Sequence, residues 1–280
     1  MGYRLGLIGY PASHSLSPWI HETFLQRSGL SGSYTIWETK PSRISNKLAE
    51  LKKQKVDGFN VTVPYKRTII PFLDCLDPAA ERIGAVNTVV NVNGKWKGYN
   101  TDGRGYIRAF KKYFPRLAAD KMINIVLIGA GGAARAIYDA LTDEGFRYVD
   151  MANRTIDHAE AIVADLNKKP TQTVINTLKH VEKRLNRYDM IIQTTSVGMY
   201  PNTEKTVISC HNLKAGSVAS DIVYRPLTTA FLKQAQLSGA QIFSGHTMLL
   251  YQAQLAFELW TGTSVSVSGC EDQLQLKLEA

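Results

Sequence analysis

Apolar positions along this chain alternate between the period of a β-strand and that of an amphipathic helix. Strand-like runs occupy residues 4–9, 34–39, 58–63, 85–94, 124–129, 148–153, 190–195, 217–223 and 241–245. Helical patterns separate most of them and cover residues 17–29, 44–54, 133–145, 158–169, 229–239 and 248–262. Alternation of this kind predicts an α/β protein with parallel sheets built from βαβ units.

With 280 residues, the chain is long enough for one large or two medium domains. The polar stretch at residues 115–122 precedes a new strand and is the best candidate for a domain boundary. No apolar run approaches the roughly 20 residues that span a bilayer, and the N-terminus lacks the pattern of an export signal. Three scattered cysteines without a CxxC pair fit a reducing cytoplasm and argue against a thiolate metal site.

The formal net charge of +9 raises the question of a nucleic-acid partner. Lys and Arg are spread along the chain, however, and no nucleic-acid-binding motif accompanies them. A basic surface favours small anions, such as a phosphate-bearing cofactor or a carboxylate substrate, over a nucleic acid.

A glycine-rich turn between a strand and a helix carries the most specific chemistry. Gly129, Gly131 and Ala134 follow the apolar strand at 124–129 with the spacing G-x-G-x-x-A and open a helical pattern. The first glycine permits a tight turn, the second lets the backbone approach a pyrophosphate, and the alanine allows close helix packing. In this strand–turn–helix context the pattern predicts dinucleotide binding.

The end of the following strand indicates which dinucleotide is bound. NAD sites usually carry Asp or Glu there, to hold the ribose 2′-hydroxyl. This chain has Asn153, Arg154 and Thr155 instead, which bring a cation and two neutral hydrogen-bonding groups. A 2′-phosphate suits that set, so NADP is favoured over NAD.

Short polar residues in the first half of the chain follow several apolar strands, where open α/β sheets bind ligands. They are Ser15, Ser17, Thr62, Asn87, Asn100, Thr101 and Asp102. Each alone is an ordinary turn or cap residue. Lys66, directly after a strand that ends in proline, reads by itself as a solvated charge at a sheet edge.

An ordered series of motifs runs through nearly the whole chain: "SHSLSP", "NVTVPYK", "GAVNT", "NTDG", "GAGGAAR", "NRT", "TTSVGM", "DIVYRPLTT" and "SGHTMLLYQA". The series resembles the shikimate dehydrogenase family and its quinate/shikimate relatives. The resemblance implies a substrate domain at 1–103 and 246–280, a Rossmann-like NADP-binding domain at 104–245, and an active site in the cleft between the two domains.

The same resemblance implies a reaction: reversible NADPH-dependent reduction of 3-dehydroshikimate to shikimate, in chorismate and aromatic amino-acid biosynthesis. Lys66 and Asp102 would be the catalytic acid–base pair. Reduction of a ketone by hydride develops negative charge on oxygen, so the chemistry needs a proton donor within hydrogen-bond reach. A lysine ammonium can polarise the carbonyl and deliver that proton.

The remaining site residues are also implied by the resemblance. The substrate-binding set is Ser15, Ser17, Thr62, Lys66, Asn87, Asp102, Tyr224 and Gln252. The cofactor-binding set is Gly129, Ala130, Gly131, Gly132, Ala133, Asn153, Arg154, Thr155, His158, Thr195, Ser196, Ile222 and Gly245. No metal is expected, because the histidines lack partners at ligand spacing.

Alternatives remain open. His158 stands where many NADP-dependent members of the family carry a second basic residue, so mixed use of NAD and NADP is one alternative. A related enzyme that prefers quinate or another polyhydroxy ring acid is a second. A non-catalytic NADP-binding regulator on the same fold is a further alternative, although Lys66 and Asp102 are both present. The expected partner is a small molecule rather than a nucleic acid or a membrane; the expected compartment is the cytoplasm, and a homodimer is left open.

Overall fold

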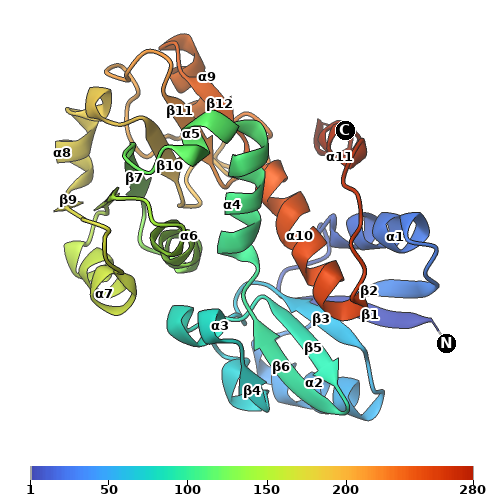
Figure 1. Cartoon of the computed structure of the whole chain (residues 1–280). Helices are drawn as coiled ribbons and strands as arrows, with labels where there is room; N and C mark the ends of the chain where they lie inside the picture. The colour runs from blue at the N-terminus through green and yellow to red at the C-terminus, as the bar shows by residue number, and fades with distance from the viewer. Residues whose placement is uncertain (1, 280) are drawn as a thin grey trace. The chain divides into compact units, whose positions relative to one another are not determined.

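The computed structural model describes residues 2–279, and Figure 1 shows that both units it contains are α/β. The chain forms two compact units. The first runs to Thr101 and includes Leu250–Cys270, and the second comprises Asp102–Leu249 and the segment from Glu271. Residues 115–119, expected in a linker, instead form the helix α5 (Pro115–Ala119) of the second unit, so the polar composition of that stretch did not mark the boundary.

The first unit is built on a six-stranded sheet with the order β2-β1-β3-β5-β6-β4. Its strands are β1 (Tyr3–Gly9), β2 (Gly32–Glu38), β3 (Gly58–Val61), β4 (Cys75–Leu76), β5 (Thr88–Val92) and β6 (Lys95–Tyr99). Its helices are α1 (Ser17–Arg27), α2 (Ile44–Lys53), α3 (Pro78–Ile83) and the part of α10 (Gly245–Thr261) from Leu250 onward, with short 3₁₀ turns at Pro41–Arg43 and Ile70–Phe72.

Alternating strand residues bury both faces of this sheet. On one face Ile8 and Phe59 pack with Leu48 and Leu51 of α2. The other face is covered by α10, whose Trp260 packs with strand residues and donates from Nε1 to the Val89 carbonyl at 2.9 Å. Strands buried on both faces read as continuous apolar runs, which is why they stood out in the sequence.

Wholly parallel sheets were a wrong prediction for the first unit, because β5 lies antiparallel to both β3 and β6. A two-residue turn joins β5 to β6: Asn93 and Gly94 both have positive φ, at 53° and 84°. Asn91 Oδ1 accepts from the Gly94 N–H at 2.8 Å. An Asn-Gly pair is the usual signal of such a hairpin, so the sequence contained the information.

The second unit contains a wholly parallel six-stranded sheet with the order β12-β11-β10-β7-β8-β9, as the alternation predicted. Its strands are β7 (Asn124–Ile128), β8 (Tyr148–Ala152), β9 (Ile175–Asn176), β10 (Met190–Gln193), β11 (Val218–Asp221) and β12 (Gln241–Phe243). Its helices are α4 (Asp102–Tyr113), α5, α6 (Gly132–Asp143), α7 (Ile156–Leu166), α8 (Leu178–Glu182), α9 (Ala230–Leu237), the start of α10 and most of α11 (Cys270–Glu279), with a 3₁₀ turn at Leu185–Arg187.

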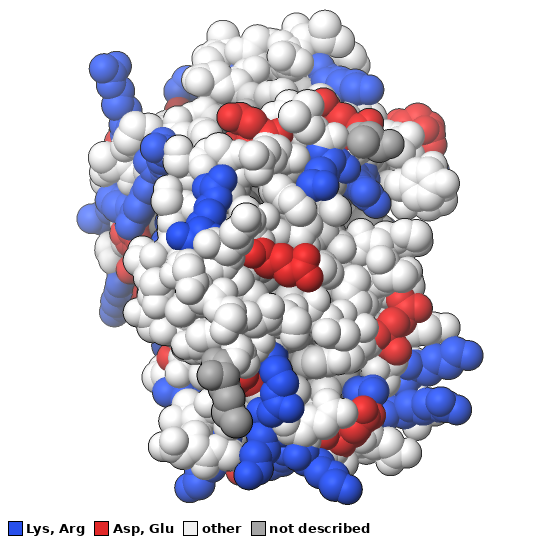
Figure 2. Space-filling model, turned by 90° about the vertical axis from the view of Figure 1, so that its right-hand side faces the viewer, with Lys and Arg blue, Asp and Glu red and all other residues white. Residues whose placement is uncertain are grey.

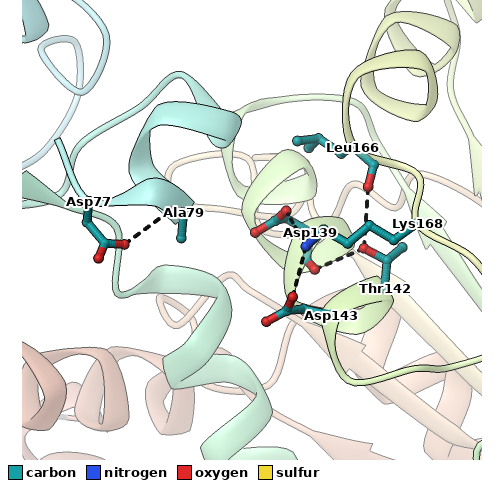
Figure 3. Close-up of polar contacts among 7 residues, drawn as sticks. All are labelled: Asp77, Ala79, Asp139, Thr142, Asp143, Leu166 and Lys168. Carbon is teal, nitrogen blue, oxygen red and sulfur yellow. Dashed lines mark hydrogen bonds and ion pairs between the residues drawn. The ribbon is translucent and has the colours of Figure 1, made fainter.

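Helices cover both faces of the second sheet. Phe231 and Leu232 of α9 pack on Val126 and Ile191, and α6 packs against β7, β8, α4 and α7. Lys168, two residues beyond α7, bridges Asp139 and Asp143 of α6 at 3.1 and 3.0 Å (Figure 3).

Every strand and helix predicted from periodicity is present, with ends shifted by up to three residues. The pattern missed β6, the two-residue strands β4 and β9, and the helices α3, α4, α5, α8 and α11. Most of these are too short for a period to show. α3 did have a local signal, because Asp77 caps it before a proline and accepts from the Ala79 N–H at 3.1 Å (Figure 3).

Within residues 2–279, no helix is both long enough and apolar enough to cross a membrane. On the face shown in Figure 2, Lys and Arg side chains form several separate groups, with acidic and uncharged surface between them. The spread of basic residues along the sequence therefore does not become a single basic block on this face.

A substitution at Gly103 tests the close packing of α4 on α6. A Cβ atom at this position would lie 2.0 Å from the Ala136 carbonyl oxygen and 2.9 Å from the Ala140 Cβ. Backbone cannot yield as a flexible side chain does, so Gly103→Ala is expected to lower the free energy of unfolding by about 1–3 kcal/mol. Urea denaturation measures this change. Arg104→Ala, on the exposed neighbour, is the control and should leave the midpoint unchanged; equal midpoints for both variants would contradict the packing.

Candidate active site

The turn between β7 and α6 has the geometry of a phosphate-binding loop. Gly129 has φ +112°, and a Cβ atom there would lie 2.7 Å from Thr194 Oγ1 and 2.8 Å from Thr195 Cγ2. Both the backbone conformation and the neighbouring threonines therefore require glycine at this position.

Open space lies in front of the next two glycines. No described atom lies within 4 Å of a Cβ built on Gly131 or on Gly132. Gly131 is the N-cap of α6, and no side chain caps the helix there. The first N–H groups of a helix have no partners within it, so this end of α6 can receive a phosphate anion. Ala134, fully buried in the first turn, provides the close helix packing that the sequence predicted.

The loop after β8 lies beside this turn, because the Gly129 N–H donates to the Ala152 carbonyl at 2.8 Å. Asn153 Nδ2 donates to the Thr155 carbonyl at 2.7 Å and shapes the loop, while Arg154 and His158 are exposed. Residues 153–155 carry no carboxylate, so this strand end offers a cation and neutral groups, a combination that fits a ribose 2′-phosphate.

Two further strands end at the same edge of the sheet. β10 leads into Thr195 and Ser196, and the Thr194 N–H donates to the Ile128 carbonyl at 2.9 Å. β11 leads into Ile222, where a Cβ added to Gly245 would lie 2.3 Å from the Ile222 carbonyl oxygen. The structure thus brings the predicted cofactor residues to one edge of one sheet.

Two buried residues of this edge were missed as site residues. Gln193 Nε2 donates to Asp221 Oδ1 at 3.0 Å and to the Val197 carbonyl at 3.1 Å. Asp221 also accepts from Thr229 Oγ1 at 2.7 Å and from the Val223 N–H at 2.9 Å. Burial raises the pKa of the Asp221 carboxyl to about 6, although these hydrogen bonds oppose the shift. The sequence signal that could have identified Asp221 was a single acidic residue at the end of an apolar strand.

In the first unit, the Asn87 side chain is the centre of a buried polar network. Its Oδ1 accepts from the Thr101 N–H at 2.8 Å and from Thr88 Oγ1 at 3.0 Å. Its Nδ2 donates to Thr101 Oγ1 at 2.8 Å and to Gln252 Oε1 at 3.3 Å. The network brings together two predicted substrate residues, Asn87 and Gln252, that lie 165 positions apart in the chain.

Asn60, in the middle of β3, extends the network and was not predicted as a site residue. Its Nδ2 donates to the Asn87 carbonyl and to Thr88 Oγ1, both at 3.1 Å, and its Oδ1 accepts from Tyr34 at 2.7 Å. The sequence signal that could have identified Asn60 was a single amide side chain inside an apolar strand, because a buried amide needs hydrogen-bond partners.

The other substrate residues of this unit are placed by local side-chain and backbone contacts. Ser15 Oγ donates to Ser17 Oγ at 3.0 Å at the start of α1. The Thr62 N–H donates to the Ile8 carbonyl at 3.0 Å, and the Lys66 carbonyl accepts from the Val86 N–H at 2.7 Å. The main chain of Lys66 is therefore fixed beside the strand end that carries Asn87.

Not every predicted residue lies in one unit. Lys66 and Gln252 belong to the first unit, whereas Asp102 and Tyr224 belong to the second. Asp102 is buried and is the first residue of α4, and Tyr224 follows β11. The pairing of Lys66 with Asp102 stays a prediction. No group of three or more His, Cys, Asp or Glu among residues 2–279 could hold a metal ion.

The two sheets and the glycine turn define a class of protein: a two-unit α/β protein with a Rossmann-like dinucleotide-binding unit. Three family models match, namely "Shikimate dehydrogenase substrate binding domain" over residues 7–89, "Shikimate / quinate 5-dehydrogenase" over 110–223 and "Shikimate 5'-dehydrogenase C-terminal domain" over 245–275. The chain belongs to the shikimate dehydrogenase family.

Relatives and solved structures agree with this assignment. The chain is 47% identical over 276 residues to the shikimate dehydrogenase (NADP(+)) of Oceanobacillus iheyensis, covering 98% of both chains. The crystal structure of shikimate 5-dehydrogenase from Thermus thermophilus with NADP(H) and shikimate has a TM-score of 0.86 at 33% identity, covering 99% of both chains. Quinate dehydrogenase from Corynebacterium glutamicum with NAD has a TM-score of 0.89 at 28% identity, also covering 99% of both.

Asp221 gives the unit a pH dependence. Its carboxyl has a pKa of 3.8 when exposed and about 6 in the fold, so between these values the folded protein holds a proton that the unfolded chain has lost. The contribution of Asp221 to the free energy of unfolding therefore falls as pH rises from about 4 to about 6, by up to about 1.4 kcal/mol per pH unit.

Urea denaturation of the wild type and Asp221→Asn across pH 4–8 measures that contribution. The free energy of the wild type minus that of the variant is expected to decrease up to about pH 6 and to stay level above it. A difference that is constant with pH would show that Asp221 is ionised throughout in the folded protein.

Proposed function

We propose that this protein is a shikimate dehydrogenase that reversibly reduces 3-dehydroshikimate to shikimate with NADPH. The observation that carries the proposal is the buried network around Asn87, which holds neutral donors and acceptors beside the main chain of Lys66 in a chain of this family. A ring acid with several hydroxyl groups needs such neutral groups, and a site built for hydroxyls rejects analogues that lack them.

Lys66 and Asp102 are the proposed catalytic pair. NADPH supplies the hydride. The Lys66 ammonium donates a hydrogen bond to the ketone oxygen and delivers the proton as negative charge develops there. In the oxidation direction its neutral amine accepts the proton, and Asp102 orients the lysine and binds the same hydroxyl.

The other substrate residues divide by chemistry. Ser15 and Ser17, with the phenol of Tyr224, are proposed to hold the substrate carboxylate. Thr62, Asn87 and Gln252 are proposed to bind the ring hydroxyls. Asn87 and Gln252 suit that role because they are already held 3.3 Å apart, which costs little conformational entropy on binding.

The edge of the second sheet is proposed to bind NADP. The open space at Gly131 and the uncapped start of α6 fit a pyrophosphate, and Arg154 fits the 2′-phosphate. Ala130, Gly132 and Ala133 complete the phosphate loop. Asn153, Thr155 and His158 are assigned to the adenosine end, and Thr195, Ser196, Ile222 and Gly245 to the ribose and nicotinamide.

The proposed substrate domain comprises residues 1–103 and 246–280, and the proposed cofactor domain comprises residues 104–245. The enzyme is proposed to work in the cytoplasm in aromatic amino-acid biosynthesis, with a small molecule rather than a nucleic acid as its partner.

A quinate/shikimate dehydrogenase with mixed NAD and NADP use is the second candidate. The NAD-bound quinate dehydrogenase of similar fold, together with the single cation Arg154 at the strand end, favours keeping it. A non-catalytic regulator is the weaker alternative, since it would not need Lys66 and Asp102.

Turnover of shikimate and quinate, each with NADP and NAD, tests these candidates in one two-by-two assay at the absorbance of the reduced nicotinamide. We expect strong turnover with shikimate and NADP alone. Arg154→Ser should then raise KM for NADP about tenfold or more, as loss of a charged hydrogen bond does, without changing KM for shikimate. Efficient turnover of quinate or NAD would favour the second candidate, and no turnover in any combination would favour the regulator.

Lys66→Ala is expected to lower kcat by about 10²- to 10⁴-fold, because it removes the proton donor. The dissociation constant for NADPH and the thermal midpoint should stay near those of the wild type. The control is Arg67→Ala, which removes an exposed positive charge at the adjacent position and should retain activity. Full activity of the Lys66 variant would contradict the assigned role.

A further inference from the structure

Tyr34, which belongs to neither predicted residue set, is linked through Asn60 to the proposed substrate residue Asn87. It stands on β2, is 4% exposed, and donates from its hydroxyl to Asn60 Oδ1 at 2.7 Å. The inference drawn from this position rests on the proposed function.

The direction of hydrogen bonding around Asn60 is fixed. Asn60 Nδ2 faces the Asn87 carbonyl, which can only accept, so Oδ1 must face Tyr34 and the tyrosine must be the donor. Because the Asn87 carbonyl also accepts from the Val61 N–H at 2.8 Å, Asn60 and β3 together hold the backbone of Asn87.

Burial raises the pKa of Tyr34 well above its usual value, so the hydroxyl keeps the proton that it donates to Asn60. Tyr34, Asn60 and the Asn87 carbonyl therefore form one chain of hydrogen bonds.

The ring of Tyr34 is held independently of its hydroxyl. It stacks on His21 with centroids 4.5 Å apart and an interplanar angle of 11°, and it lies 6.3 Å from the Trp260 ring. His21 is fully buried, and its ring nitrogens have no hydrogen-bond partner among residues 2–279. Phenylalanine at position 34 would therefore keep the packing and lose only the polar link.

We propose that Tyr34 is a positioning residue that holds the Asn60–Asn87 network in place. Through Asn60, its hydroxyl fixes the position of Asn87, which is assigned to the ring hydroxyls of the substrate. Tyr34 thus acts on recognition of the polyhydroxy ring without touching the substrate.

The test is Tyr34→Phe, with Tyr138→Phe as the matched control. Tyr138 is also buried, and its hydroxyl shares a 2.7 Å hydrogen bond with Thr173 in the second unit. Tyr34→Phe is expected to raise KM for shikimate about tenfold, because Asn60 Oδ1 loses its donor, with a smaller change in kcat and an unchanged KM for NADP. The control should change neither KM.

Side-chain amide NMR provides a readout that needs no turnover. The Nδ2 resonances of Asn60 and Asn87 are expected to shift in Tyr34→Phe and not in Tyr138→Phe.

The outcomes separate this inference from the proposed function. A wild type that is inactive with shikimate, together with shifted amide resonances in Tyr34→Phe, would reject the proposed substrate and retain the positioning role of Tyr34. Unchanged Asn87 resonances in Tyr34→Phe would overturn the inference whatever the activity, as would equal changes in KM for shikimate and NADP.

Discussion

A buried amide must find all its hydrogen-bond partners inside the protein, and the polar part of the first unit is arranged around that requirement at Asn87. Its side chain joins β5 to Thr101 at the end of β6 and to Gln252 on α10, elements that are distant in sequence. Leaving one of these groups unpaired would cost about 1–3 kcal/mol, which favours a single arrangement of the strand ends over alternatives. The same constraint that stabilises the unit therefore shapes the place where a polar ring could bind.

The second unit satisfies a different requirement: main-chain N–H groups must stay accessible at the edge of its sheet. Gly129 and Gly245 leave no room for a side chain, since their neighbours lie within van der Waals contact of a Cβ atom, whereas Gly131 borders open space. The carboxyl ends of β7, β8, β10 and β11 consequently present N–H groups and short side chains at one edge of the sheet. The buried Asp221 holds the β10 and β11 loops together, so the shape of this edge depends on a carboxylate that does not itself line the phosphate loop.

These two constructions explain how one chain can serve a polyhydroxylated substrate and a dinucleotide. In the proposed function, neutral side chains in a buried network would recognise hydroxyl groups by hydrogen-bond direction, while a helix start and an exposed arginine would bind phosphate through charge. Specificity for the ring would then depend on residues such as Tyr34, which fix the network without touching the substrate. Cofactor preference would depend on Arg154 at the surface.

The sequence by itself determined the α/β class, the parallel second sheet, the glycine turn and the neutral loop after β8, because each depends on local periodicity or on residues a few positions apart. It also contained the Asn-Gly signal of the hairpin in the first sheet, which the periodicity alone did not reveal. The partners of Asn87, the link from Tyr34 to Asn60 and the raised pKa of Asp221 were decided only by the tertiary structure. Those properties arise from burial and from contacts between distant segments, and neither is set by any one stretch of the chain.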